Sequence, residues 1–525
     1  MTIDATMTGL ARPQPRRVVV AELVDRSRKR LDTLSDARLT ATFEDLLYME
    51  RKRLERAPPE PELEGHLDDL AKALVRGGRS DRMDAALGVI GLWGDEIHGR
   101  FNPRVYRGAT RVLPRALSGL LSGRPGRLRD WSLSSQSRLR VKGNLPLLAQ
   151  LAKESTLVLA PTHVSNLDSP LIGLALYLAG LPPFVYGAGL NLFSNPMVGW
   201  WLGRLGAYTV DRTKKARLYK DVLKDYSVRC LTTRHHSLFF PGGTRSRSHE
   251  VEPRIKKGLL GTAAVAWQEM LAAKRPDSEV YIVPLTLSFT LTLEAATLIE
   301  DHLADAGKQR YIITDDEFAQ PRRLASFFRR VMDLDSAMVA HFGDPIDCLG
   351  FPVSADPAER AEQAIHRRRY VTDAQGEVEW DAQRDRIYTD RLGGALIDAW
   401  PRYAEVLPTH LAAWAAWRCL EAQVGSTDPF RLVRTPADGR HLDRGDYLAC
   451  LRTELQRVKD GGKAGRWGEQ LPNTAEEVLE VALDRFARYH RSRALTTADS
   501  RVFVQDPKLC LYYRNRLTFM DRENA

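Results

Sequence analysis

A histidine and an aspartate lie five positions apart in the stretch "HVSNLD", as His163 and Asp168. A neutral imidazole can take the proton of an alcohol, and a carboxylate on its other ring nitrogen fixes the tautomer and stabilises the imidazolium that forms. One tight turn would bring these two side chains together. Because Ser169-Pro170 are typical of a helix start, the alternative is that Asp168 only caps a helix.

A second group of candidates is basic. Arg212 ends the apolar segment "GAYTVDR" (206–212), and further basic residues follow it: Lys214, Lys215, Arg217 and Lys220. A guanidinium at a strand end suits bidentate binding of phosphate. The alternative is an ordinary solvated start of a helix.

The third group lies in "FFPGGTRSRS" (239–248). Gly242 and Gly243 allow a close approach to the backbone, and Arg245 can bind a phosphate or stabilise an oxyanion. The stretch is neither the GxSxG of a hydrolase nucleophile nor a Walker loop, because no Gly-Lys-Ser/Thr follows at the required spacing. A turn that is merely basic is the alternative.

The segments that must position these residues alternate between apolar strands and helices. We expect strands at 139–143, 155–161, 182–188, 206–212, 236–243 and 279–289, and helices that include 144–153, 214–230 and 259–273. This pattern predicts an α/β domain over 136–352, with a central β-sheet flanked by helices. The candidates His163, Arg212 and Arg245 all follow strands, where such folds place their chemistry. Pro284 inside the last strand predicts an edge or a bulge.

The flanking regions, 1–135 and 353–525, are expected to be mainly helical. Apolar residues recur at helical spacing near the N-terminus, at Leu31, Leu34, Leu39, Phe43 and Leu46. The segment "SGRPGR" (122–127) is a plausible domain boundary. After residue 353 we expect a charged connection with a hairpin at 372–380, followed by helices.

Composition narrows the possible partners. The 525 residues carry a formal charge of +10, which favours an anionic partner such as nucleic acid, an anionic membrane or a phosphorylated or CoA-type substrate. Basic and aromatic residues do not cluster as a nucleic-acid platform requires, so we expect no nucleic acid. The five cysteines lack metal-ligand spacing, which disfavours a zinc site or a disulfide framework and fits a reducing, cytoplasmic compartment.

Membrane contact, if it exists, is expected to be peripheral. We find neither a signal peptide nor an apolar run of the roughly 18 residues that a spanning helix needs. Trp200 and Trp201 are candidates for lining an acyl tunnel, entering the bilayer interface or packing in the core. Four arginines at helical spacing form either a solvated face or a surface for lipid headgroups: Arg104, Arg107, Arg111 and Arg115.

Taken together and in this order, the motifs resemble those of the glycerolipid acyltransferase superfamily. "HVSNLD" is similar to its His-x4-Asp signature, and "GAYTVDR", "FPGGTRS" and "VPL" (283–285) to the three blocks that follow, over about residues 140 to 350. "AGLNL", "LEAATL" (293–298) and "LYYRNRL" (511–517) resemble the glycerol-3-phosphate and dihydroxyacetone-phosphate branch. Gly242 stands where family members usually carry glutamate.

The resemblance implies a reaction. A long-chain acyl group would pass from acyl-CoA or acyl-ACP, as co-substrate, to a hydroxyl of glycerol 3-phosphate in phospholipid biosynthesis. His163 would be the general base and Asp168 its orienting partner. A lysophosphatidate O-acyltransferase is the nearest alternative, and a non-catalytic lipid-binding protein a more distant one.

The resemblance also implies supporting roles. Backbone amides around Gly242 and Gly243 would hold the oxyanion. Arg245, assisted by Arg212 and Lys257, would bind the acceptor phosphate. No metal or bound cofactor is expected, and the protein would lie on the inner face of the cell membrane.

Overall fold

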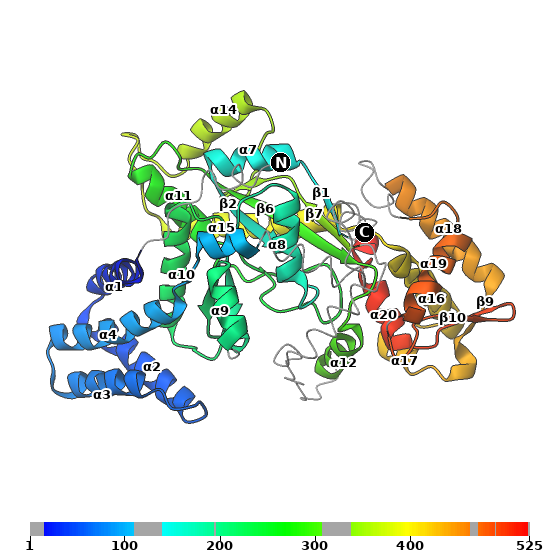
Figure 1. The fold of residues 1–525 in the computed structure, drawn as a ribbon, viewed down its shortest axis with the longest axis horizontal. Helices are drawn as coiled ribbons and strands as arrows, with labels where there is room; N and C mark the ends of the chain where they lie inside the picture. Colours follow the sequence, from blue (N-terminus) through cyan, green and yellow to red (C-terminus); the bar gives the residue numbers. More distant parts are fainter. Residues whose placement is uncertain are drawn as a thin grey trace.

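The computed structural model describes residues 15–109, 139–193, 196–306, 338–461, 471–488 and 490–522. Within it, a helical N-terminal region, a central α/β domain and a helical C-terminal region follow one another across the molecule (Figure 1). Arg111, Arg115 and the expected boundary at 122–127 lie outside the described residues. The predicted fold class is confirmed: a central sheet flanked by helices, with helical regions on both sides.

The central sheet has eight strands in the order β1-β7-β6-β2-β5-β3-β4, with β8 also paired to β6. Strands β2, β5, β3 and β4 run parallel, so their carboxyl ends meet at one edge. Among the described strands of this sheet, only the β6–β7 and β6–β8 pairs are antiparallel. The strands are β1 (Leu139–Lys142), β2 (Thr156–Pro161), β3 (Val185–Gly189), β4 (Ala207–Val210), β5 (Ser237–Leu238), β6 (Val280–Phe289), β7 (Met338–Phe342) and β8 (Ile346–Asp347).

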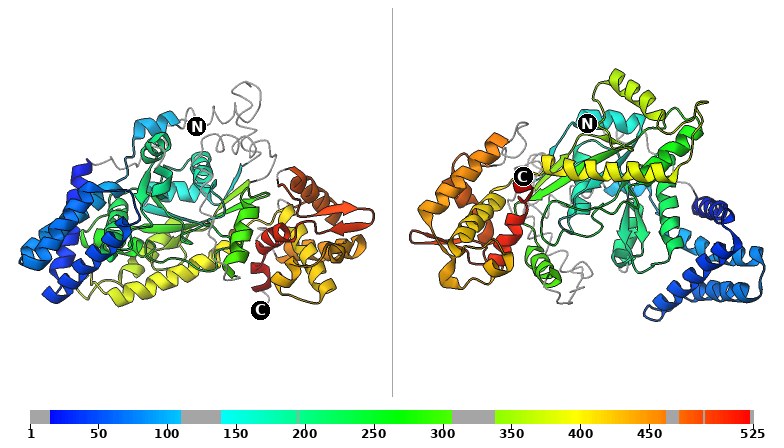
Figure 2. Two further views of the ribbon diagram at one scale, coloured as in Figure 1. Left: turned by 90° about the horizontal axis from the view of Figure 1, so that it is seen from below. Right: turned by 180° about the vertical axis from the view of Figure 1, so that it is seen from behind.

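Both faces of the sheet are covered because alternate residues of a strand point to opposite sides. In β2, Leu157 and Leu159 pack in the cluster that contains α7 (Leu145–Glu154) and α8 (Asp168–Leu178). Val158 and Ala160 pack on the other face, with α11 (Thr262–Ala272) and α15 (Ala382–Tyr403). The view from behind shows α15 running across that face (Figure 2).

Pro284 lies in the interior of the sheet, so the prediction of an edge strand is wrong. Its strand, β6, lies between β2 and β7. The Pro284 carbonyl accepts a 2.7 Å hydrogen bond from the Gly343 amide, so the side of β6 that lacks a donor faces β7 and β8. Because β7 ends at Phe342 and β8 begins at Ile346, the missing donor falls opposite the break between them.

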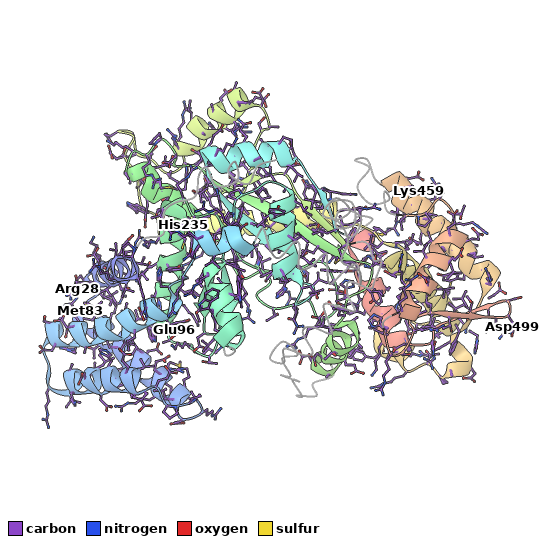
Figure 3. The ribbon with its side chains drawn as sticks, in the orientation of Figure 1. Arg28, Met83, Glu96, His235, Lys459 and Asp499 are labelled. Atoms are coloured by element: carbon purple, nitrogen blue, oxygen red, sulfur yellow. The ribbon has the colours of Figure 1, made fainter. Side chains whose placement is uncertain are left out.

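The N-terminal region consists of α1 (Arg16–Asp32), α2 (Asp36–Leu54), α3 (Pro61–Arg76) and α4 (Arg79–Ile97). It packs on α10 (Arg217–Thr232) in one hydrophobic cluster, where the rings of Trp93 and Tyr219 meet edge to face at 5.5 Å. Glu96 lies at the end of α4 that faces the central domain (Figure 3). Its carboxylate pairs with the buried Lys214. These contacts attach the region to the edge of the sheet that carries β4.

The C-terminal region shares its core with the central domain. Trp400 of α15 and Trp414 belong to the same buried cluster as Val158 of β2, and the Trp400 indole donates a 3.0 Å hydrogen bond to the Ala160 carbonyl. The remaining elements are α14 (Pro357–Arg368), α16 (Pro408–Val424), α17 (Pro429–Val433), β9 (His441–Asp443), α18 (Arg444–Gly461), α19 (Ala475–Arg488), β10 (Thr496–Ala498), β11 (Arg501–Phe503), α20 (Pro507–Asn515) and α21 (Phe519–Arg522). The expected hairpin at 372–380 forms one bridge, between Thr372 and Val378.

No helix among the described residues is long and apolar enough to cross a bilayer.

Candidate functional site

The carboxyl end of β2 delivers His163 to the edge of the sheet where the parallel strands end. Its Nδ1 lies 2.7 Å from Oδ2 of Asp168, the first residue of α8. Because a carboxylate only accepts hydrogen bonds, Nδ1 carries the proton and Nε2 is the nitrogen that can receive another. The Asp168 side chain is fully buried, whereas that of His163 is 17% exposed.

Asp168 binds the turn in front of α8 and does not cap the helix. Its Oδ2 accepts hydrogen bonds from the backbone amides of Val164, at 2.6 Å, and Ser165, at 3.0 Å. An N-cap side chain would accept from amides two or three positions further along, and none does so here. The alternative role that the sequence left open for Asp168 is therefore not observed.

The backbone of His163 is bound on both sides by the chain that follows β5. Its carbonyl accepts a 2.7 Å hydrogen bond from the Ser246 amide, and its own amide donates a 3.1 Å hydrogen bond to Oε1 of Glu252. The Phe240 ring stacks on the imidazole, with the centroids 4.1 Å apart. These contacts therefore join the first and third sequence blocks around His163.

Glu294, which precedes α12 (Ala295–Ala306), connects the first block to Arg245. Its Oε2 accepts from the Ser165 hydroxyl at 2.9 Å, and its Oε1 accepts from the Asn166 amide at 2.9 Å. The Arg245 guanidinium lies 3.4 Å from the same Oε1. Burial raises the pKa of Glu294. Arg245 is thus held beside the loop that carries His163, with further N–H groups on its guanidinium to bind an anion.

The glycine turn differs from the expected oxyanion site. Gly243 has a φ of +77°, a conformation that favours glycine, and its amide donates to the Phe240 carbonyl at 3.0 Å. The Gly243 amide therefore makes a hydrogen bond within the turn and is not available to an oxyanion. Of the two expected amides, only that of Gly242 lacks an acceptor in the described part of the chain.

Lys257 points away from this turn. Its Nζ lies 2.7 Å from Asp390 of α15, on the far face of the sheet. The preceding residue, Lys256, is the one beside the turn: a Cβ atom built on Gly243 would lie 2.8 Å from its Nζ. Neighbouring side chains on an extended segment point to opposite sides, so Lys256 and Lys257 have different surroundings.

Arg212 lies at the same edge of the sheet but on a distant strand. It is exposed and follows β4, which is separated from β2 by β5 and β3. Three strand spacings of about 4.8 Å put the two strand ends about 14 Å apart. The structure therefore does not bring Arg212 against His163, although the two residues face the same side of the domain.

Behind the His163 loop lies a buried cation, Arg516, which follows α20. Its guanidinium interacts electrostatically with both Asp168 and Glu252, and burial lowers its pKa to about 10. Burial also raises the pKa of Glu252, to about 7. The Asn515 amide group donates a 3.0 Å hydrogen bond to the Ser248 carbonyl, so the C-terminal region contacts the third block directly.

Trp200 and Trp201 lie on α9 (Pro196–Arg204) and are 46% and 42% exposed. Their rings meet edge to face at 5.2 Å, and the Arg204 guanidinium lies 4.1 Å above the Trp200 ring. Leu190 is similarly exposed at 44%. A cavity of about 720 Å³ between α9 and the N-terminal helices is lined by Trp200 and Arg204 among others. Core packing is therefore not the role of these tryptophans.

Sequence reasoning missed four residues that shape the site: Phe240, Glu252, Glu294 and Arg516. The motifs "LEAATL" and "LYYRNRL" contain two of them, Glu294 and Arg516, so a signal was present without a role attached to it. Glu252, in "HEVEPR", carried no recognisable signal, because its contacts with His163 depend on how the loop folds back.

Comparisons with known proteins bear on the class of the central domain. Residues 139–288 match the family model described as Acyltransferase. This part of the chain is therefore similar to an acyltransferase domain, as the resemblance of its motifs led us to expect. The match covers β1 to nearly the end of β6 and includes every candidate catalytic and phosphate-binding residue.

Among similar proteins, the glycerol-3-phosphate acyltransferase of Pseudomonas putida (strain GB-1) is 26% identical over 266 residues, which are 50% of this chain and 29% of that protein. The dihydroxyacetone phosphate acyltransferase of Bos taurus is 28% identical over 254 residues, 48% of this chain and 34% of that protein. This chain thus matches only about a third or less of the length of either relative. A crystal structure of the 1-acyl-sn-glycerophosphate acyltransferase from Thermotoga maritima aligns with 50% of this chain and 91% of its own, at 15% identity and a TM-score of 0.24.

Proposed function

We propose that this protein transfers a long-chain acyl group from a thioester, acyl-CoA or acyl-ACP, to a hydroxyl of glycerol 3-phosphate. The observation that carries the proposal is the 2.7 Å hydrogen bond between His163 Nδ1 and the buried Asp168. It lies in an acyltransferase domain, and Arg245 is tied to the same loop through Glu294. A base and an anion-binding group side by side match an acceptor with a hydroxyl and a phosphate.

In the proposed step, Nε2 of His163 takes the proton of the acceptor hydroxyl as its oxygen attacks the thioester carbonyl. A tetrahedral oxyanion forms, and the Gly242 amide is the candidate donor to it. When the C–S bond breaks, the proton on Nε2 passes to the departing thiolate. An ester and a free thiol result, and His163 returns to its neutral form. Asp168 stabilises the intermediate imidazolium throughout.

For the acceptor phosphate, Arg245 is the first candidate ligand, as the sequence suggested. Lys256 replaces Lys257 as the assisting lysine, because Lys256 lies at the glycine turn and Lys257 pairs with Asp390. Arg212 is a ligand only for an acceptor or donor that extends across β5 and β3. The names of the relatives support glycerol 3-phosphate or dihydroxyacetone phosphate as acceptor.

We also propose that the protein works at the inner, anionic face of the cell membrane. The exposed side chains of Leu190, Trp200 and Trp201, with Arg204 beside them, support this location, because tryptophan and arginine favour the headgroup region. Flotation with anionic and neutral liposomes tests it. Binding to anionic liposomes that is lost in Trp200→Ala/Trp201→Ala supports the location, and no binding at low salt refutes it.

The decisive assay offers the purified protein a radiolabelled long-chain acyl-CoA with glycerol 3-phosphate, dihydroxyacetone phosphate or lysophosphatidate. We expect glycerol 3-phosphate to give the highest kcat/KM. His163→Ala should lower kcat by about 100- to 10,000-fold, the usual contribution of a general base, with an unchanged melting temperature.

Each other outcome excludes a specific part of the proposal. Preference for lysophosphatidate would assign the alternative acceptor, which brings a second acyl chain. Lipid binding without turnover, or turnover unaffected by His163→Ala, would favour a non-catalytic lipid-binding protein or another site. Repeating the assay with acyl-ACP identifies the donor.

A further inference from the structure

The most unusual feature around His163 is a carboxylate that fills the space beside a glycine. A Cβ atom built on Gly242 would lie only 2.2 Å from Oε2 of Glu252 and 2.7 Å from its Oε1. Such distances are far shorter than any real contact, so the two groups compete for one place. The φ of Gly242 lies outside the left-handed region, and therefore its backbone does not itself require glycine.

The Glu252 side chain is buried, with 7% of the residue exposed, and it reaches one particular partner. Its Oε1 accepts the hydrogen bond from the His163 amide at 3.1 Å. This amide is next to the Cα atom from which the imidazole projects. With the Ser246 amide on the His163 carbonyl at 2.7 Å, both peptide groups of His163 are fixed by the loop that follows β5.

The surroundings of Glu252 act on its charge in opposite directions: burial disfavours the charged carboxylate, and the hydrogen bond from the His163 amide stabilises it. Asp168 lies near enough to interact unfavourably with it, and the Arg516 guanidinium interacts favourably with both carboxylates. A buried carboxylate is costly unless it is hydrogen-bonded and paired, and Glu252 has an amide donor and a buried cation. Three elements far apart in sequence thus meet at this point: the first block, the third block and the C-terminal region.

We propose that Glu252 is a positioning residue for His163, and that its carboxylate takes the place that a side chain at position 242 would occupy. The inference rests on the proposed function, because it concerns the base of that reaction. It predicts that a carboxylate can be moved from position 252 to position 242 without losing its effect. The shorter aspartate side chain suits this exchange, since its oxygens lie at about the distance from Cβ at which the Glu252 oxygens now lie.

The experiment compares kcat and KM of the wild type, Glu252→Ala, Gly242→Asp/Glu252→Ala and the matched control Gly242→Ala/Glu252→Ala. Misplacing a reacting group by about 1 Å can cost about 100-fold in rate. We therefore expect Glu252→Ala to lower kcat by about 10- to 100-fold with KM nearly unchanged. The aspartate double variant should recover at least about tenfold over the alanine double variant. Glu250→Ala, two residues away, is the control for changes in this loop.

A second readout does not need acyl transfer. The rate at which diethyl pyrocarbonate modifies His163, followed by mass spectrometry, should rise severalfold in Glu252→Ala and return toward the wild-type rate in Gly242→Asp/Glu252→Ala. The inference would be overturned if a folded Glu252→Ala variant kept the wild-type kcat and the wild-type reactivity of His163. It would also be overturned if Gly242→Asp/Glu252→Ala and Gly242→Ala/Glu252→Ala behaved alike in both assays. An inactive wild type with the expected reactivity series would refute the proposed function and support only the positioning of His163 by Glu252.

Discussion

The hydroxyl of Ser165 donates a 2.9 Å hydrogen bond to Oε2 of Glu294, across 129 positions of sequence. This contact gives the Ser-Asn pair between His163 and Asp168 a role, since the Asn166 amide binds the other oxygen of the same carboxylate. Because Arg245 approaches that oxygen as well, Glu294 links the shape of the His163 loop to the position of the candidate phosphate ligand.

Glu294→Ala should therefore affect both acceptor binding and catalysis. It removes the acceptor of the Ser165 hydroxyl and the Asn166 amide, and each unsatisfied buried donor costs about 1–3 kcal/mol. We expect a lower melting temperature, a lower kcat and a higher KM for the acceptor. Arg245→Ala should raise mainly KM, and additive effects in the double variant would show that the two residues act separately.

Asp168→Asn tests the role of the negative charge. The amide oxygen can take the place of Oδ2 and accept from the Val164 and Ser165 amides and from His163 Nδ1, but it carries no charge to stabilise the imidazolium. We expect kcat to fall by about 100- to 10,000-fold in a protein that still folds. Asp69→Asn, an exposed change in α3, is the control. Wild-type turnover in Asp168→Asn would exclude the role given to the carboxylate.

The neighbouring lysines offer a matched pair. Lys256→Ala should raise KM for the phosphate acceptor by about tenfold, because a hydrogen bond to a charged group contributes about 1.5–3 kcal/mol. Lys257→Ala loses a half-exposed ion pair with Asp390 and should change stability by less than about 1 kcal/mol, with KM unchanged. Steady-state kinetics of the two variants measure both KM values. A larger rise in KM for Lys257→Ala than for Lys256→Ala would contradict our assignment.

Glu252 should make stability depend on pH. Its pKa is raised by burial to about 7, above its ordinary value of 4.5, so the folded state binds more protons than the unfolded state between these values. The contribution of Glu252 to the free energy of unfolding is therefore greatest below about pH 4.5, and it declines as the pH rises toward 7. The His163 amide and Arg516 oppose this shift, and Asp168 adds to it.

Glu252→Gln should flatten that part of the profile. Urea unfolding at several pH values between 4.5 and 7.5 measures the slope of the free energy of unfolding. If Glu252→Gln kept the wild-type dependence of the free energy of unfolding on pH, another group would be responsible for that dependence.

The sequence predicts the framework of the site well, because its signals are local. Strand β2, the His163 turn and the start of α8 are adjacent in the chain, so apolar runs and turn residues suffice to place them. The fold class is confirmed, and residues 139–288 match an acyltransferase domain. The catalytic and phosphate-binding roles, the localisation and the absence of a cofactor remain predictions.

What the sequence could not supply depends on contacts between distant segments. Nothing local distinguishes Lys256 from Lys257, or shows that Pro284 faces the break between β7 and β8. Strands β9, β10 and β11 form a separate three-stranded sheet and have three residues each, which is too short for a period-two pattern to appear. Glu252 and Arg516 gain their roles only when the loop after β5 and the C-terminal region pack against β2.

The position of Arg516 also bears on how the protein is made. A ribosome completes the sheet, the His163 loop and Glu252 long before it reaches α20, and domains can begin to fold during synthesis. Until residues 507–517 arrive, Asp168 and Glu252 face each other without their shared cation. A chain that stops before residue 507 would therefore contain the four sequence blocks of residues 140 to 350 but would lack Arg516 near Asp168 and Glu252, so the surroundings of His163 depend on a segment made long after the blocks themselves.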